Sequence, residues 1–138
     1  DPFGITFRLD IFLPWVTEAI NYADEEMSET VRWLKSKDIP VALLTNSVPE
    51  FRSVIEKTIP IHDLFNVIVD SSEVGYRKPD RKIYEITAGR LGVQESACLM
   101  VDDLEHNVFG ARQTGMTAIH FKDSFKVKKK IFDLFNSN

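Results

Sequence analysis

The sequence has little of several features that define whole classes of proteins. Its one cysteine, Cys98, can form no internal disulfide and is typical of a protein in a reducing compartment. No uninterrupted apolar run approaches the ~20 residues of a membrane-spanning helix. The 17 basic residues are outnumbered by 21 acidic ones, and the net charge of −4 disfavours nucleic acid as the main partner. We therefore expect a cytoplasmic protein whose partners include neither nucleic acid nor a membrane.

What the chain does contain is the composition of an ordinary globular domain. Of its 138 residues, 43% are hydrophobic and 28% are charged, which are common values for soluble proteins. A chain of this length can bury a sizeable core, and it shows no internal repeat or low-complexity segment. We therefore expect one main core.

Short apolar runs alternate with segments of helical periodicity. We predict strands at residues 40–46, 66–71, 97–103 and 117–122. Between them apolar residues recur at helical spacing, as Met27, Val31 and Leu34 do, and Gly92 is placed to end a helix. This alternation over short links predicts an α/β fold, a three-layer Rossmann-like parallel sheet with helices on both faces.

The run at residues 99–103 ends abruptly in two adjacent carboxylates, Asp102 and Asp103. Ligands of open α/β sheets collect outside the carboxyl ends of the strands, and two acids there suit a hard cation such as Mg²⁺. The two carboxylates also repel each other, and a bound cation would relieve that cost. The alternative is that both acids only complement the dipole of a following helix.

Two further polar elements stand upstream of the acid pair. The strand at residues 40–46 ends in Thr45 and Asn46, and Ser47 follows, at a junction whose backbone N–H groups suit an anion. Helix capping is the alternative role for these side chains. Lys78 precedes Pro79, which biases it away from the helical conformation and holds it at a fixed place in a loop. There it can neutralise a phosphate or an attacking carboxylate, or it is a solvated turn lysine.

In this order the elements resemble the haloacid dehalogenase-like hydrolase superfamily. The resemblance runs from about residue 25 onwards and includes Asn107, four residues after Asp103. Its most specific part is the stretch at residues 73–84, EVGYRKPDRKIY. This stretch is similar to members with a helical cap inserted after the first strand, including the amino-terminal phosphatase domain of soluble epoxide hydrolases. The acid pair is similar to that of phosphatases and phosphomutases in this branch.

The resemblance implies a Mg²⁺-dependent phosphatase that acts on a small phosphorylated metabolite through an aspartyl-phosphate intermediate. It implies that Thr45, with the backbone beside it and at Asn46, binds the phosphate. Lys78 would neutralise both the phosphate and the nucleophile. Mg²⁺ would bind Asp103 directly, while Asp102 joins the metal shell or holds Lys78. A further implied residue is Asn107, which would orient the acid pair from the next helical turn.

The sequence departs from the family in one essential motif. Family members carry the nucleophile and its acid–base partner in an Asp-x-Asp motif at the end of the first strand, and this chain contains no Asp-x-Asp. The nearest candidate is Asp10, with Phe12 in the second position, and a surface strand aspartate explains it as well. We expect residues 1–24 to be the end of a cap and residues 25–138 to be a core that lacks its first strand. A substitute strand at residues 5–12 is the alternative.

On this hypothesis the given chain is one part of a longer phosphatase, is inactive alone, and has the remainder of its own chain or another domain as a partner. A catalytically inactive domain of the same fold, used as a binding or structural module of a larger protein, is the main alternative. A receiver-like regulatory domain also uses an acid pair, a threonine and a lysine. That class places its acid pair near the first strand, whereas Asp102 and Asp103 follow Thr45 and Lys78 here.

Overall fold

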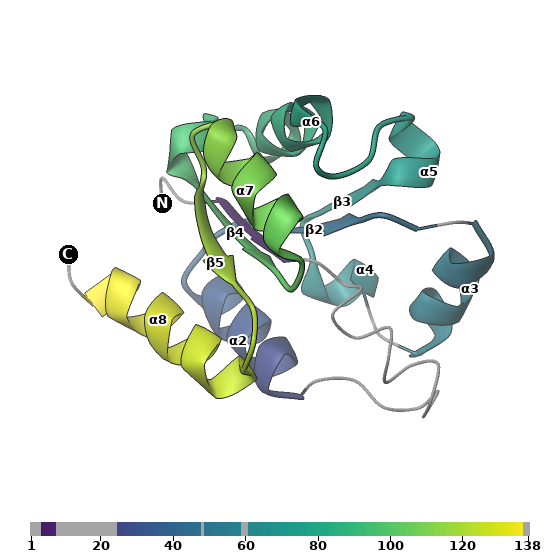
Figure 1. Cartoon of the computed structure of the whole chain (residues 1–138). Coiled ribbons are helices and arrows are strands. Elements are labelled where there is room, and N and C mark those ends of the chain that lie inside the picture. Colours follow the sequence, from purple (N-terminus) through teal and green to yellow (C-terminus); the bar gives the residue numbers. More distant parts are fainter. Residues whose placement is uncertain (1–3, 8–24, 48, 59–60, 137–138) are drawn as a thin grey trace.

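The computed structural model describes residues 4–7, 25–47, 49–58 and 61–136, and these residues form a five-stranded sheet flanked by helices (Figure 1). The strands are β1 (Gly4–Phe7), β2 (Val41–Thr45), β3 (Val67–Asp70), β4 (Cys98–Asp102) and β5 (Thr117–His120). They lie in the order β3-β2-β1-β4-β5, and every neighbouring pair is parallel. The predicted parallel α/β fold and the four predicted strands are confirmed.

The helices alternate with the strands along the chain. They are α2 (Glu25–Ser36), α3 (Pro49–Thr58), α4 (Ile61–Leu64), α5 (Ser71–Val74), α6 (Arg81–Leu91), the 3₁₀ helix η2 (Glu95–Ala97), α7 (Glu105–Gln113) and α8 (Ser124–Asn136). Within α2, the predicted apolar face of Met27, Val31 and Leu34 is buried. Gly92 ends α6 in the left-handed conformation, with φ 76°. None of the helices in the described part of the chain is long and apolar enough to cross a membrane.

Buried side chains of the central strands divide between two hydrophobic clusters. Leu43 and Val101 belong to one cluster together with residues of α2, α4 and α8. Leu44 and Met100, their neighbours in sequence, belong to the other cluster together with residues of α6 and α7. Because successive side chains of a strand point to opposite faces, this division means that both faces of the sheet are covered. That explains why the strands read as continuous apolar runs rather than alternating ones.

The middle of the sheet is occupied by β1, where Phe7 lies beside Leu43 of β2 and Val101 of β4. The sequence predicts a core that lacks a strand at this position, and the structure corrects this expectation: residues 4–7 fill the place, as the alternative of a substitute strand proposes. The physical reason is that β2 and β4 would otherwise expose unpaired buried backbone groups, at about 1–3 kcal/mol each. Asp10 and the rest of residues 8–24 lie outside the described residues.

Candidate functional site

The predicted site residues gather at the carboxyl edge of the sheet. Thr45 is the last residue of β2 and Asp102 is the last residue of β4, with β1 between these two strands. Lys78 lies in the loop between α5 and α6. The sequence separates Thr45, Lys78 and Asp102 widely, and parallel strand order alone brings their carboxyl ends to one edge.

At the centre of this edge lies a buried ion pair. The Lys78 Nζ atom is 3.0 Å from Asp102 Oδ2, and both side chains are fully buried, at 0% exposure. Nζ also donates to the Leu44 carbonyl oxygen at 3.0 Å. Leu44 lies on β2 and Asp102 on β4, so the ammonium spans the two strands that flank β1. On the other carboxylate oxygen, Asp102 accepts a hydrogen bond from Leu104 N at 2.9 Å. The contact with Lys78, one of the two implied roles for Asp102, is present in the structure.

Two hydrogen bonds join the loop that carries Lys78, between α5 and α6, to the end of β2. Lys78 N donates to Asn46 Oδ1 at 2.8 Å, and Asn46 Nδ2 donates to the Lys78 carbonyl oxygen at 3.1 Å. The amide of Asn46 thereby fixes the backbone of Lys78 on both sides. The sequence predicts Asn46 beside the phosphate. It does not predict the contact between Asn46 and Lys78, because these residues are 32 positions apart.

Two buried polar side chains at this edge have no hydrogen-bond partner among the described residues. They are Thr45, 1% exposed, through its hydroxyl, and Asn107, 0% exposed, through both atoms of its amide. A buried polar group left without a partner costs about 1–3 kcal/mol, so such groups suit a polar ligand that supplies the missing bonds. The predicted contact of Asn107 with the acid pair is not among the described hydrogen bonds.

The donor set fits a hard cation. Among the described residues there is no cluster of three or more His, Cys, Asp or Glu side chains that can hold a metal ion. Asp102 and Asp103 are the adjacent carboxylates at the end of β4, and Asp103 is half-buried, with its carbonyl oxygen 2.9 Å from His120 Nε2. Mg²⁺ is usually bound by one or two carboxylates together with water and substrate phosphate. The Thr45 hydroxyl, which has no partner in the described part of the chain, lies at the same edge.

Helix α7 supports the site from behind the lysine loop. The Tyr84 hydroxyl donates to the Asn107 carbonyl oxygen at 2.8 Å. A Cβ atom at Gly110 would lie 2.8 Å from Pro79 Cβ, closer than real Cβ contacts allow. Only glycine at this position lets α7 approach the loop that carries Lys78. The sequence predicts Tyr84 only as part of a helix. No local signal in the sequence identifies Gly110 as a packing site.

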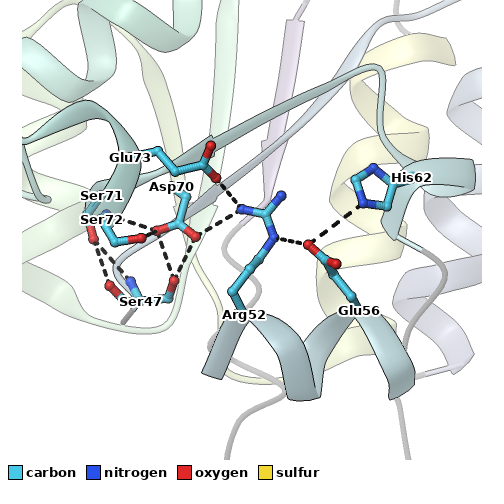
Figure 2. Close-up of polar contacts among 8 residues, drawn as sticks. All are labelled: Ser47, Arg52, Glu56, His62, Asp70, Ser71, Ser72 and Glu73. Atoms are coloured by element: carbon cyan, nitrogen blue, oxygen red, sulfur yellow. Dashed lines mark hydrogen bonds and ion pairs between the residues drawn. The ribbon is translucent and has the colours of Figure 1, made fainter. Parts of the chain in front are cut away.

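A second polar cluster surrounds Asp70, the last residue of β3 and the register partner of Thr45 on β2 (Figure 2). The carboxylate is 1% exposed and accepts hydrogen bonds from Ser47 Oγ, at 2.8 and 2.9 Å, from Arg52 Nη1 at 2.9 Å, and from Ser72 N and Oγ at 2.9 and 2.8 Å. Burial alone raises the pKa of Asp70, but the hydrogen bonds from Ser72, Ser47 and Arg52 outweigh it, so the pKa lies below its ordinary value.

Asp70 is not among the residues predicted for the site, although its position in the sequence indicates one. Asp70 is an acid at the end of a predicted strand, as Asp102 is, and the same edge rule applies to both. The Ser47 hydroxyl donates to Asp70, a contact that the sequence does not indicate. Arg52 has no signal in the sequence, since its contact with Asp70 depends on where α3 lies relative to the end of β3.

Comparison with known proteins agrees with this geometry. The family model described as haloacid dehalogenase-like hydrolase matches residues 9–115. The chain is 33% identical over 102 residues to the sesquiterpene phosphatase astK of Aspergillus oryzae, which is 73% of this chain and 52% of that protein. It is 36% identical over 86 residues to the phosphatase MT3486 of Mycobacterium tuberculosis, 61% of this chain and 39% of that protein. The chain thus spans about half or less of the length of these two relatives.

Solved structures share the fold. An uncharacterized protein from Corynebacterium glutamicum superposes with a TM-score of 0.76 at 18% identity, over 96% of this chain and 94% of that chain. A HAD family enzyme from Bacteroides thetaiotaomicron, in complex with magnesium and inorganic phosphate, superposes with a TM-score of 0.63 at 22% identity, over 71% of this chain and 52% of that chain. At these identities the likeness shows the fold alone.

Proposed function

Because the chain belongs to the haloacid dehalogenase-like hydrolase family, we propose that it forms the phosphate- and magnesium-binding part of a phosphatase that acts on a small phosphorylated metabolite. The observation that carries the proposal is the fully buried Lys78 ammonium, held between β2 and β4 by Leu44 and Asp102. A structural ion pair gains little from complete burial, since desolvation offsets the attraction. A cation fixed at a ligand-binding edge is instead suited to phosphoryl transfer, which depends on positioning and charge neutralisation.

The chain's own residues supply the charge and the hydrogen bonds of such a site. Lys78 would offset the negative charge of the phosphate and of the carboxylate that attacks it to form an aspartyl-phosphate. The Thr45 hydroxyl would donate to a phosphate oxygen, which supplies the partner it lacks among the described residues. Asp103 and Asp102 would hold Mg²⁺, with Asn107 orienting the acids. When bound, Mg²⁺ would neutralise phosphate charge during the displacement.

The finer family placement is part of the same proposal. The stretch at residues 73–84 supports the capped branch similar to the phosphatase domain of soluble epoxide hydrolases. We infer a three-layer arrangement around the sheet, in which residues 4–7 are its central strand β1 rather than the end of a cap. In the family the Asp-x-Asp motif follows the first strand, whose place β1 takes here, and the sequence after β1 offers Asp10 with Phe12 in the second position.

A second candidate function is a catalytically inactive domain of the same fold that serves as a binding or structural module. The specific observation in its favour is the missing Asp-x-Asp. Phosphate binding does not separate the two candidates, because both can retain Thr45 and Lys78. Turnover separates them.

The test uses the protein purified from its native source, with its intact mass and N-terminal sequence determined. Hydrolysis of p-nitrophenyl phosphate is measured with MgCl₂ and with EDTA. We expect Mg²⁺-dependent turnover, which Lys78→Met abolishes in the recombinant protein and which Lys82→Met, at an exposed lysine four residues away, leaves intact. Turnover that survives Lys78→Met would contradict the assigned role. A native protein that binds phosphate without turnover would establish the inactive module.

A further inference from the structure

The polar cluster around Asp70 lies beside the proposed phosphate site. None of the residues assigned to that site belongs to this cluster. Asp70 and Thr45 are register partners on adjacent strands, so their backbones lie about 5 Å apart. We propose that Asp70 and Arg52 are positioning residues that hold the loop Thr45–Ser47 in its phosphate-binding geometry. This inference rests on the proposed function and extends it to residues that contact neither phosphate nor metal in that proposal.

The loop is held from two sides. On one side Asn46 exchanges two hydrogen bonds with the backbone of Lys78. On the other side the Ser47 hydroxyl lies within hydrogen-bond distance of both carboxylate oxygens of Asp70, and Ser47 N donates to Ser71 Oγ at 3.1 Å. Thr45 immediately precedes these two anchored residues. A shift of the Ser47 anchor therefore moves the backbone N–H groups and the hydroxyl that would face a phosphate.

Asp70 has more hydrogen-bond donors than the capping of a four-residue helix requires. One bond, from Ser72 N, caps α5. The bonds from Ser47 and Arg52 come instead from the loop and from α3, both of which follow β2 in the chain. The carboxylate thereby joins β3, the loop and α3 at one buried point, which Figure 2 shows between the Ser47 side chain and the Arg52 guanidinium.

Arg52 acts through Asp70 in this arrangement. Its guanidinium forms ion pairs with Asp70 at 2.9 Å, with Glu73 at 2.5 Å and with Glu56 at 2.6 Å. Three carboxylates surround one arginine, so Arg52 compensates negative charge that would otherwise repel an anion next to Thr45. The buried Asp70 carboxylate is the member of this group nearest to the phosphate loop in register. Without Arg52, its charge would remain uncompensated in a region of low dielectric constant.

The experiment measures the affinity of inorganic phosphate by isothermal titration calorimetry in MgCl₂, for four proteins. These are the unmodified chain, Asp70→Asn, Arg52→Met and the double variant. We expect each single variant to weaken phosphate binding about tenfold. Because Arg52 acts through Asp70, the double variant should match Asp70→Asn rather than show a hundredfold additive loss. Additive losses would overturn the assigned route, and unchanged affinities would overturn the positioning role.

Matched controls separate positioning from simple loss of stability. Thr87→Val removes a buried hydroxyl whose bond to the Ile83 carbonyl oxygen lies within α6, away from the loop. It should lower the melting temperature and leave phosphate affinity unchanged. Glu56→Gln alters an Arg52 partner that does not touch Asp70 and should also leave phosphate affinity unchanged. Arg52→Lys should recover part of the affinity that Arg52→Met loses, because it restores the charge.

A second readout does not depend on phosphate. Hydrogen–deuterium exchange of residues 45–47 without ligand should be faster in Asp70→Asn than in the unmodified chain, and unchanged in Thr87→Val. If the unmodified chain binds no phosphate while exchange at residues 45–47 is still faster in Asp70→Asn, the proposed function fails and the positioning role of Asp70 stands. If exchange at residues 45–47 is the same in both proteins, the positioning role of Asp70 is refuted, whatever ligand the chain binds.

Discussion

Replacing Thr45 by valine separates function from stability more sharply than other substitutions at the site. Valine has the shape of threonine without its hydroxyl and is favoured in strands. The Thr45 hydroxyl is buried and has no hydrogen-bond partner among the described residues. Removing it therefore breaks no described contact and relieves a desolvation cost of about 1–3 kcal/mol. We expect Thr45→Val to be as stable as the unmodified chain, or more stable by about 1 kcal/mol.

The affinity of Thr45→Val for phosphate should fall, although its stability should not. A hydrogen bond to a charged group contributes about 1.5–3 kcal/mol, so its loss should weaken phosphate binding by about 10- to 100-fold. The assays are urea unfolding and calorimetric titration with inorganic phosphate in MgCl₂. Thr87→Val is the matched control, because its hydroxyl does have a partner at 2.8 Å. That variant should lose about 1 kcal/mol of stability and keep its phosphate affinity.

The reasoning about Thr45 would be refuted by the reverse pattern. A Thr45→Val protein that is destabilised by more than about 1 kcal/mol would mean that the hydroxyl has a structural partner. Unchanged phosphate affinity in a stable variant would mean that the hydroxyl does not contact the ligand. Either result removes Thr45 from the proposed site.

Three further predictions concern the elements around the site. Lys78→Met leaves the fully buried Asp102 without its cation and should cost about 3–5 kcal/mol, measured by urea unfolding; an unchanged stability would contradict the buried pair. Gly110→Ala should lower the melting temperature, because the new methyl group would overlap Pro79, and a neutral result would mean that α7 can move away. Because the pKa of Asp70 is lowered from its ordinary 3.8, its stabilisation should be complete above that pH and lost as pH falls through the folded value. The stability difference from Asp70→Asn should therefore shrink on acidification, and a pH-independent difference would contradict this.

Much of the fold follows from local sequence pattern. The strands predicted at residues 40–46, 97–103 and 117–122 form within two residues of their predicted ends, because buried parallel strands require continuous apolar runs. The sequence offers β1 only as the alternative of a substitute strand at residues 5–12, since four residues carry too little periodicity to identify a central strand. Its place is decided by the unpaired backbone of β2 and β4, which is a property of the whole sheet.

Part of the candidate site likewise follows from local sequence pattern, and part of it depends on the folded chain. Thr45 and Asp102 could be placed at one edge from strand order, because both are the last residues of apolar runs. The pairing of Lys78 with Asp102 could not be derived from spacing, since it joins a loop to a strand across 24 residues. The contact of Arg52 with Asp70 depends on the docking of α3, which no pattern of charges in the sequence specifies.

The central claim is that this edge of the sheet binds phosphate together with Mg²⁺. The most direct test is a titration of the isotopically labelled chain with MgCl₂ and inorganic phosphate, followed by NMR of the backbone amides. We predict Mg²⁺-dependent shifts at Thr45, Asn46 and Lys78. Absence of shifts at these three residues at saturating phosphate, or shifts confined to exposed lysines of α8 such as Lys126 and Lys130, would contradict the account.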